Sequence, residues 1–155
     1  MGKQAMATPN IASSSIERVE ATKERLNKFL NEWHDDAANS RHAYFDKIAP
    51  EGIYIGTDKT ERWNREEFRT WAAEYFAKPS AWAFTPLHRN VIIAADGRIA
   101  WFDEQLSSGM GVLQASGVLR IEGEVAEILH YQLSLTIPNG LVGEITKLIQ
   151  GAGAQ

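Results

Sequence analysis

The spacing of apolar residues changes once along the chain, and this change constrains the fold more than any other feature. Before Pro79, apolar residues recur every three to four positions, as in amphipathic helices; after it, they alternate with polar residues, as in half-buried strands. Two tight-turn signals, Asp96-Gly97 and Glu122-Gly123, join successive strands. Helices followed by hairpin-linked strands predict an α+β domain with an antiparallel sheet, because parallel strands need long crossover connections.

Residues 14–50 carry the pattern of two helices. Ser14 and Glu17 have the spacing of a capping box, which predicts that the first helix begins there. Asp35 or Asp36 caps the second predicted helix, which ends before the proline that closes this segment.

A third helix and a set of strands complete the pattern. Asn64 and Glu67 have capping-box spacing and predict the start of the third helix, which ends at Lys78-Pro79. A short strand is predicted between the second and third helices, four more strands follow the third helix, and a short helix ends the series. The predicted strands cover 52–58, 84–95, 99–106, 112–121 and 125–137, and the last helix covers 142–149.

The length and composition fit one compact domain. A chain of 155 residues is long enough to bury a core without covalent cross-links. The absence of cysteine excludes disulfides, thiolate zinc sites and a cysteine nucleophile. A formal net charge of −4 argues against a nucleic-acid-binding or anionic-membrane surface.

The two ends of the chain predict flexible segments around this domain. Residues 1–13 have no apolar run of the kind that a signal peptide needs, and are interpreted as a flexible arm. Residues 14–150 form the predicted domain and 151–155 a flexible tail. No apolar run is long enough to cross a bilayer, so the predicted location is the cytoplasm.

The predicted elements combine into a cone. An antiparallel sheet of four or more strands curves strongly, and helices with aromatic stripes cover its concave face. Such a cone leaves a space between helices and sheet, which is a favoured place for a small ligand.

Short sequence segments in both halves of the chain resemble those of a known family. They are Tyr44-Phe45, Ile53-Tyr-Ile-Gly-Thr-Asp58, Glu61-Arg-Trp63, Glu67-Phe68, Ala100-Trp-Phe-Asp-Glu104, Ser116-Gly-Val-Leu119, His130-Tyr-Gln-Leu-Ser134 and Ile137-Pro-Asn139. With the order of elements, they resemble SnoaL-like (polyketide-cyclase-like) domains of the nuclear transport factor 2-like superfamily over residues 16–140. Ala126 departs from the pattern, since relatives often have a tryptophan there.

The resemblance implies a cystatin-like roll, a strongly curved antiparallel sheet wrapped around the N-terminal helices. It also implies a homodimer through the outer face of the sheet. Members include isomerases, cyclases, dehydratases, hydrolases, transport factors and assembly modules, so the fold alone leaves the activity open. The enzymes of the superfamily perform acid–base chemistry with Asp, His and Tyr inside the cone.

Asp103 and His130 are the candidate catalytic residues. Asp103 and Glu104 point to opposite faces of one strand, and Asp103 shares its face with Trp101, which favours Asp103 as the inward carboxyl. The alternative is a surface carboxylate or an ion pair with Arg89 or Arg120. His130 lies in the polar row of the last strand, which is either a pocket wall, where it can act as a general base, or a solvent or subunit face.

Aromatic and amide side chains are the candidate ligand contacts. The tyrosines can donate a hydrogen bond to a developing enolate or simply belong to the core, and three tryptophans fall where the open end of the cone is expected. Trp33 and Trp71 fall on helical core stripes. The predicted ligand-binding residues are Tyr44, Tyr54, Trp63, Trp82, Trp101, Tyr131 and Gln132.

Three functions remain open on the sequence. The first is a cofactor-independent acid–base enzyme of isomerase, cyclase or dehydratase type acting on a hydrophobic cyclic ligand; the others are a non-catalytic ligand-binding module and a homodimeric assembly module. No cofactor motif is present, and a metal site is disfavoured because His34 and His42 lack chelating spacing. An enzyme requires titratable groups that converge in one cavity. A binding module is expected to have an aromatic cavity with isolated polar groups, and an assembly module is expected to have a filled cone.

Overall fold

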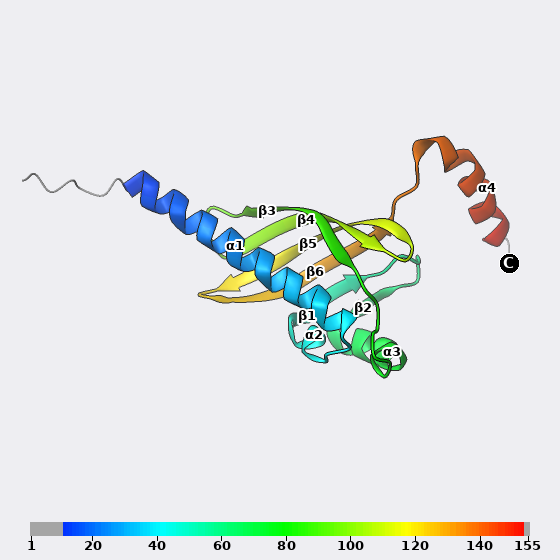
Figure 1. The fold of residues 1–155 in the computed structure, drawn as a ribbon, viewed down its shortest axis with the longest axis horizontal. Helices are drawn as coiled ribbons and strands as arrows, with labels where there is room; N and C mark the ends of the chain where they lie inside the picture. The colour runs from blue at the N-terminus through cyan, green and yellow to red at the C-terminus, as the bar shows by residue number, and fades with distance from the viewer. Residues whose placement is uncertain (1–10, 154–155) are drawn as a thin grey trace, which may run out of the picture.

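A computed structural model describes residues 11–153 of the chain (Figure 1). It contains four α-helices, one 3₁₀ helix and six strands within these residues. In chain order they are α1 (Ile11–Ala38), α2 (Ala43–Asp46), β1 (Ile48–Ile55), β2 (Arg62–Asn64), α3 (Arg65–Phe76), β3 (Thr85–Ile93), β4 (Ile99–Ser108), β5 (Gly111–Glu122), β6 (Val125–Leu135), η1 (Asn139–Leu141) and α4 (Val142–Ala152). The predicted α+β class and the curved sheet are confirmed.

The six strands form one sheet in the order β2-β1-β6-β5-β4-β3. Strands β3 to β6 are joined by hairpins and pair antiparallel, as the turn signals predict. Gly97 and Gly123 take positive φ angles of 70° and 61° in two of these turns. The sheet is not wholly antiparallel, however, because β1 lies parallel to β6. This pair is possible because β2, α3 and three strands intervene and supply the crossover that parallel strands need.

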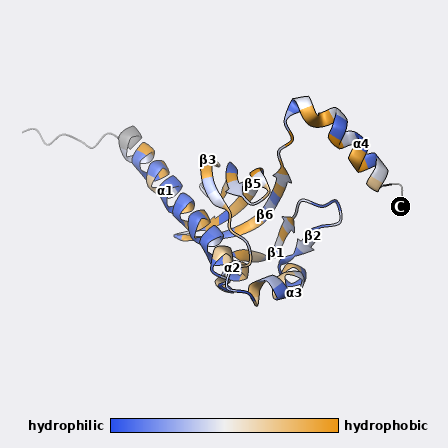
Figure 2. Cartoon of the chain, turned by 45° about the vertical axis from the view of Figure 1, so that its right-hand side comes forward, coloured by the Kyte–Doolittle hydropathy of each residue, from blue (hydrophilic) through white to orange (hydrophobic). Residues whose placement is uncertain are grey.

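Helix α1 crosses the concave face of the sheet and supplies one side of the core (Figure 1). Leu26, Leu30, Trp33 and Ala37 follow each other at helical spacing and are all buried. The N-terminal part of α1 extends past the sheet, where Ile16 is 64% exposed. Hydrophilic residues lie between the apolar ones along α1 (Figure 2). The apolar stripe positions α1 on the sheet together with polar contacts, such as the hydrogen bond that Arg89 Nη1 donates to the main-chain oxygen of Asn27 at 3.1 Å.

The start of α1 differs from the prediction. The helix begins at Ile11, so Ser14 lies within it and the predicted capping box does not mark its first turn. The predicted boundary between an arm at 1–13 and the domain thus falls inside α1, and residues 1–10 lie outside the described part of the chain. The tail predicted at 151–155 likewise begins within α4, and residues 154–155 are not described.

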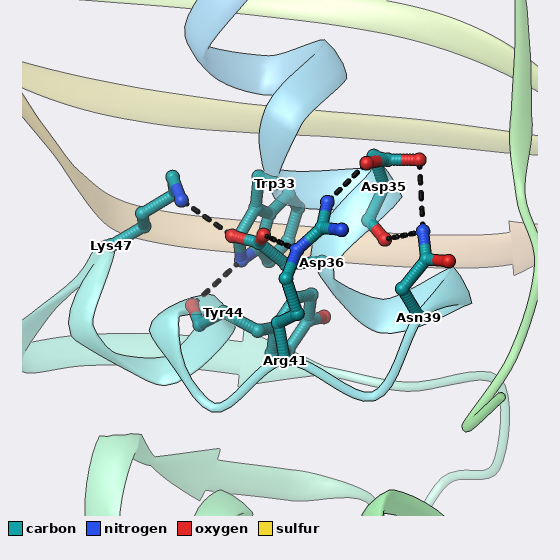
Figure 3. Close-up of polar contacts among 7 residues, drawn as sticks. All are labelled: Trp33, Asp35, Asp36, Asn39, Arg41, Tyr44 and Lys47. Atoms are coloured by element: carbon teal, nitrogen blue, oxygen red, sulfur yellow. Dashed lines mark hydrogen bonds and ion pairs between the residues drawn. The ribbon is translucent and has the colours of Figure 1, made fainter. Parts of the chain in front are cut away.

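A polar cluster at the end of α1 replaces the predicted second helix. The helix runs through Asp35 and Asp36, and Asp36 accepts hydrogen bonds from Arg41 Nε at 2.8 Å and from Lys47 (Figure 3). Trp33 Nε1 donates to the main-chain oxygen of Tyr44 at 3.1 Å. These contacts turn the chain back within a few residues, so only the four-residue α2 forms and β1 begins before the predicted strand.

The start of α3 agrees with the prediction. The Asn64 side chain accepts a hydrogen bond from the Glu67 main-chain N–H at 3.0 Å, and the Glu67 carboxylate accepts one from the Asn64 main-chain N–H at 2.9 Å. This capping box fixes α3 directly after β2. As a result, the aromatic residues of α3 lie beside those of β1 and β2.

Candidate functional site

An aromatic pocket lies at the end of the sheet that holds the β1–β2 and β4–β5 turns. Its volume is about 290 Å³, at the small end of the range for ligand sites. Strands β1 and β2, helix α3 and the segment before β3 build its walls. The residues that line it are Tyr54, Gly56, Thr57, Glu61, Trp63, Phe68, Trp71, Tyr75, Ala81, Trp82, Phe84, Met110 and Leu133.

The walls of this aromatic pocket are flat rings stacked on one another. The rings of Tyr54 and Phe68 stack with centroids 4.0 Å apart, and those of Trp63 and Phe68 with centroids 5.3 Å apart. Trp71 lies against Trp63 at 4.4 Å and leads to the solvent-facing rim. Each ring is held by its neighbours, so the pocket presents a preformed flat apolar surface to a ligand.

Glu61 is the carboxylate that lines the pocket, and it is hydrogen-bonded within the β1–β2 turn. Its Oε2 accepts a hydrogen bond from the main-chain N–H of Asp58 at 3.3 Å. A Cβ at position 56 would lie 2.0 Å from that oxygen, so only glycine leaves room for it at Gly56. Glu61 thus serves the β1–β2 turn at the rim of the pocket.

A buried polar network lies deeper in the cone, around Glu104 of β4. Glu104 Oε1 lies 2.7 Å from His34 Nε2 and accepts the Tyr131 hydroxyl hydrogen at 2.8 Å. Its Oε2 accepts a hydrogen bond from Arg89 Nε at 2.7 Å. Because an ionised carboxylate can only accept, His34 Nε2 carries the hydrogen of this contact. Both oxygens of Glu104 are therefore occupied by donors from three directions.

The surroundings of Glu104 favour its charged form. Burial alone raises the pKa of this carboxyl, but the hydrogen bond and charge of His34, the charge of Arg89 and the Tyr131 hydroxyl outweigh it. The net result is a pKa below the ordinary value for a glutamate. Glu104 is thus an anion held by fixed partners.

Three tyrosines near this network remain neutral phenols. Burial raises the pKa of Tyr44 and Tyr131 well above the ordinary value, and nearby Tyr54 and Glu104 add to the effect. Burial also raises the pKa of Tyr54. The ring of Tyr54 separates the pocket from Tyr131, whose centroid lies 5.5 Å away. The network therefore supports the floor of the pocket from below, and its members do not line the cavity.

Residues 26–138 match the family model of the SnoaL-like domain. The chain belongs to this family.

Solved structures similar to this SnoaL-like protein share its fold at low sequence identity. An NTF2-like protein with a cystatin-like fold from Novosphingobium aromaticivorans has a TM-score of 0.66 and 11% identity, covering 83% of this chain and 92% of that one. An NTF2-like protein of unknown function from Pseudomonas putida has a TM-score of 0.61 and 12% identity, and the match covers 77% of this chain and 90% of that one. A candidate ketosteroid isomerase from Parabacteroides distasonis has a TM-score of 0.57 and 18% identity, and the match covers 73% of this chain and 86% of that one.

Other comparisons add little beyond the fold. No curated protein matches the SnoaL-like chain by sequence. In the described part of the chain, no helix is long and apolar enough to span a membrane. Among the same residues, no group of three or more His, Asp or Glu side chains is placed to hold a metal ion.

The structure divides the predicted site residues of the SnoaL-like domain into three groups. Tyr54, Trp63 and Trp82 line the aromatic pocket. Tyr44 and Tyr131 are buried beneath it. The remaining four lie on the opposite, outer face of the sheet; they are Trp101, Asp103, His130 and Gln132.

The inward carboxyl of β4 is Glu104, and the prediction that Asp103 points into the cone is wrong. Asp103 is exposed and accepts a hydrogen bond from Asn90 Nδ2 at 2.9 Å. The prediction expected that face to be buried because it carries Trp101, but Trp101 is 45% exposed. His130 lies on the same outer face, which agrees with the alternative that the polar row of β6 faces solvent or a subunit. Catalysis by Asp103 and His130 stays a prediction without support from their placement.

Several residues of the site were not predicted. Trp71 was assigned to the core, yet it is 39% exposed at the rim of the pocket. His34, Arg89 and Glu104 form the buried network, and none of them was a predicted site residue, although Arg89 was considered as an ion-pair partner for a carboxylate of this strand. One sequence signal could have identified Glu104: it alternates with apolar Phe102 and Leu106, and all three are buried.

Proposed function

We propose that this SnoaL-like protein binds a flat, apolar, cyclic small molecule in the aromatic pocket. The observation that carries the proposal is the set of stacked rings around a cavity of about 290 Å³. Apolar walls with few polar groups suit a ligand whose free energy of binding comes from buried hydrophobic area. The rings already stack on one another, so little ordering is needed when a ligand enters.

The same geometry favours binding over acid–base chemistry. A general acid or base must lie within hydrogen-bond reach of the reacting atoms. Glu104 and His34 are buried below the floor, and both oxygens of Glu104 are occupied. Glu61 is engaged in its turn. Isolated polar groups around an aromatic cavity are the arrangement expected of a ligand-binding module.

A fluorescent titration with N-phenyl-1-naphthylamine tests this proposal. This probe is neutral, flat and aromatic, and its emission rises in apolar surroundings. We expect saturable binding by the unaltered chain, and binding about tenfold weaker after Trp71→Ala, because a ring that covers the ligand is lost. Trp101→Ala is the matched control, since Trp101 is similarly exposed but lies on the outer face.

Two outcomes of this titration would refute the proposal. One is the absence of saturable binding by the unaltered chain, and the other is equal weakening by the two substitutions. Melting curves must show that both variants are folded at the temperature of the titration. We expect Trp71→Ala to melt lower than Trp101→Ala, because the ring of Trp71 packs against that of Trp63 with centroids 4.4 Å apart.

The homodimer through the sheet remains a prediction beside this function. Ile92 and Trp101 are 49% and 45% exposed and are direct partners on neighbouring strands β3 and β4. Exposed apolar side chains in such a position are what a subunit contact on the outer face requires.

A further inference from the structure

Helix α4 carries an apolar stripe that no other part of the described residues 11–153 covers. Five large side chains lie along one side of the helix and the residue before it, at positions i, i+1, i+4, i+7 and i+8: Leu141, Val142, Ile145, Leu148 and Ile149. No residue of α4 is buried, and Leu148 and Ile149 are 69% and 62% exposed. The helix stands away from the body of the domain, with hydrophobic and hydrophilic segments along it (Figures 1 and 2).

Such a helix needs a surface to pack on. Isolated helices shorter than about 12–15 residues are marginal in water. Helix α4 has 11 residues, and Glu144 and Lys147 give its polar side no net charge. Helices that bind membrane surfaces have a polar side rich in Lys and Arg, so α4 is poorly suited to that role.

The rim of the aromatic pocket is a matching apolar surface in the same chain. Trp71, Tyr75 and Met110 line the pocket and are 39%, 39% and 53% exposed. The inward row of β6 continues to this rim, from buried Leu133 to Leu135, which is 49% exposed. The concave face of the sheet is therefore apolar and uncovered at its open end.

A short tether connects these two apolar surfaces. The β4–β5 turn and α4 lie at the same end of the sheet, opposite the N-terminal end of α1 (Figure 1). Thr136 Oγ1 donates a hydrogen bond to the main-chain oxygen of Val112 at 2.6 Å, so residues 137–140 link the sheet to α4. Asn139 and Gly140 belong to η1, in which the Leu141 main-chain N–H donates a hydrogen bond to the Pro138 oxygen at 2.8 Å. Even when fully extended, at about 3.3–3.6 Å per residue, this link reaches at most roughly 14 Å, so it keeps α4 near the rim.

The tether also decides which partner the stripe meets first. A short covalent link that can bring two surfaces together gives them an effective local concentration in the millimolar range. A second copy of the chain at micromolar concentration competes poorly with it. Continuity of the chain thus favours the chain's own pocket as the surface that α4 covers.

We infer that α4 is a lid that swings about residues 137–140 and closes its apolar stripe over the occupied aromatic pocket. This inference rests on the proposed ligand-binding function. A bound apolar ligand fills the cavity and completes a continuous surface of ligand and rim. Closure then buries that surface together with the stripe, so the lid favours the bound state and slows release of the ligand.

Paired charge substitutions in α4 test the lid. Leu148→Glu places a carboxylate in the stripe, whereas Gln150→Glu adds the same charge on the polar side two residues away. Both positions are exposed, so neither change is expected to affect the fold. We expect Leu148→Glu to weaken N-phenyl-1-naphthylamine binding about tenfold, mainly through faster dissociation, and Gln150→Glu to leave it unchanged.

Cross-linking shows where α4 closes, because the chain contains no other cysteine. The variant Leu148→Cys with Lys78→Cys places one thiol in the stripe and one beside the ring of Tyr75, which the Lys78 ammonium approaches to 5.4 Å. With a short bismaleimide, we expect cross-linked monomers whose yield rises with the probe. Leu148→Cys with Arg98→Cys is the control, since Arg98 follows the β3–β4 turn at the opposite end of the sheet.

The outcomes separate the lid from the function on which it rests. Absence of probe binding by the unaltered chain refutes the proposed function. Normal probe binding with equal affinity of Leu148→Glu and Gln150→Glu refutes the lid alone. Cross-linked dimers in place of monomers also refute it, and assign the stripe to a second copy.

Discussion

Replacing Glu104 by glutamine is expected to lower the free energy of unfolding by about 3–5 kcal/mol, the usual cost of breaking a buried ion pair. The substitution removes the anion but leaves the Arg89 guanidinium, whose side chain is 5% exposed, without its counter-charge. His34 also loses the carboxylate that accepts from its Nε2. Such a loss is a large part of the stability of a domain of this size.

Asp103→Asn is the matched control for this prediction. It makes the same chemical change at the adjacent residue, but Asp103 is exposed on the outer face of the sheet. We expect the free energy of unfolding to change by less than about 0.5 kcal/mol. Urea unfolding of both variants near neutral pH measures the difference. A larger loss for Asp103→Asn would mean that the two carboxylates are assigned to the wrong faces.

The second large effect is a steep loss of stability in alkaline solution. Burial raises the pKa of Tyr44, Tyr54 and Tyr131 in the folded state, whereas phenols of the unfolded chain ionise near pH 10. The stability from these three groups is fully present below pH 10 and is lost as the pH rises toward their folded pKa values. In that window unfolding releases protons, so the free energy of unfolding falls as the pH rises. The slope is about 1.4 kcal/mol per pH unit for each tyrosine, or about 4 kcal/mol per pH unit for the three together.

Urea unfolding at several pH values above 9 measures this slope, and ultraviolet absorbance reports the phenolates. Tyr54→Phe keeps the ring but removes one titrating hydroxyl, so it should reduce the slope by about one third. Tyr75 is 39% exposed, so the absorbance is measured in a Tyr75→Phe variant, which retains only the three buried tyrosines. In that variant, phenolate absorbance that rises near pH 10, before the fold is lost, would show that these hydroxyls reach water and would contradict the burial that we describe.

Local signals predicted α3 and the four hairpin-linked strands, but not the course of the chain between α1 and β1, where a second helix was expected. The hairpin glycines and the capping box at Asn64 act within a few residues, so their physics is visible in the sequence. The parallel contact between β1 and β6 is different, because its two strands are separated by most of the chain. No local pattern specifies which edge of the meander an earlier strand joins.

The site was predicted in part, and the error has a physical cause. Alternation shows that Asp103 and Glu104 face opposite sides, but the tertiary packing decides which side is inward. The prediction took Trp101 as the sign of the buried face and gave less weight to the apolar neighbours of Glu104. Trp63 and Trp82 line the aromatic pocket, whereas Trp101, which was predicted with them at the open end of the cone, lies on the outer face of the sheet.

The five tryptophan side chains offer the most direct test of the aromatic pocket as a ligand site. Each indole N–H gives one signal in a ¹H–¹⁵N NMR spectrum, and saturating N-phenyl-1-naphthylamine shifts those whose rings it touches. We expect shifts for Trp63, Trp71 and Trp82, which line the pocket, and none for Trp101 on the outer face or for Trp33, which is fully buried. A shift of Trp101 with no change in the three pocket signals would contradict the account.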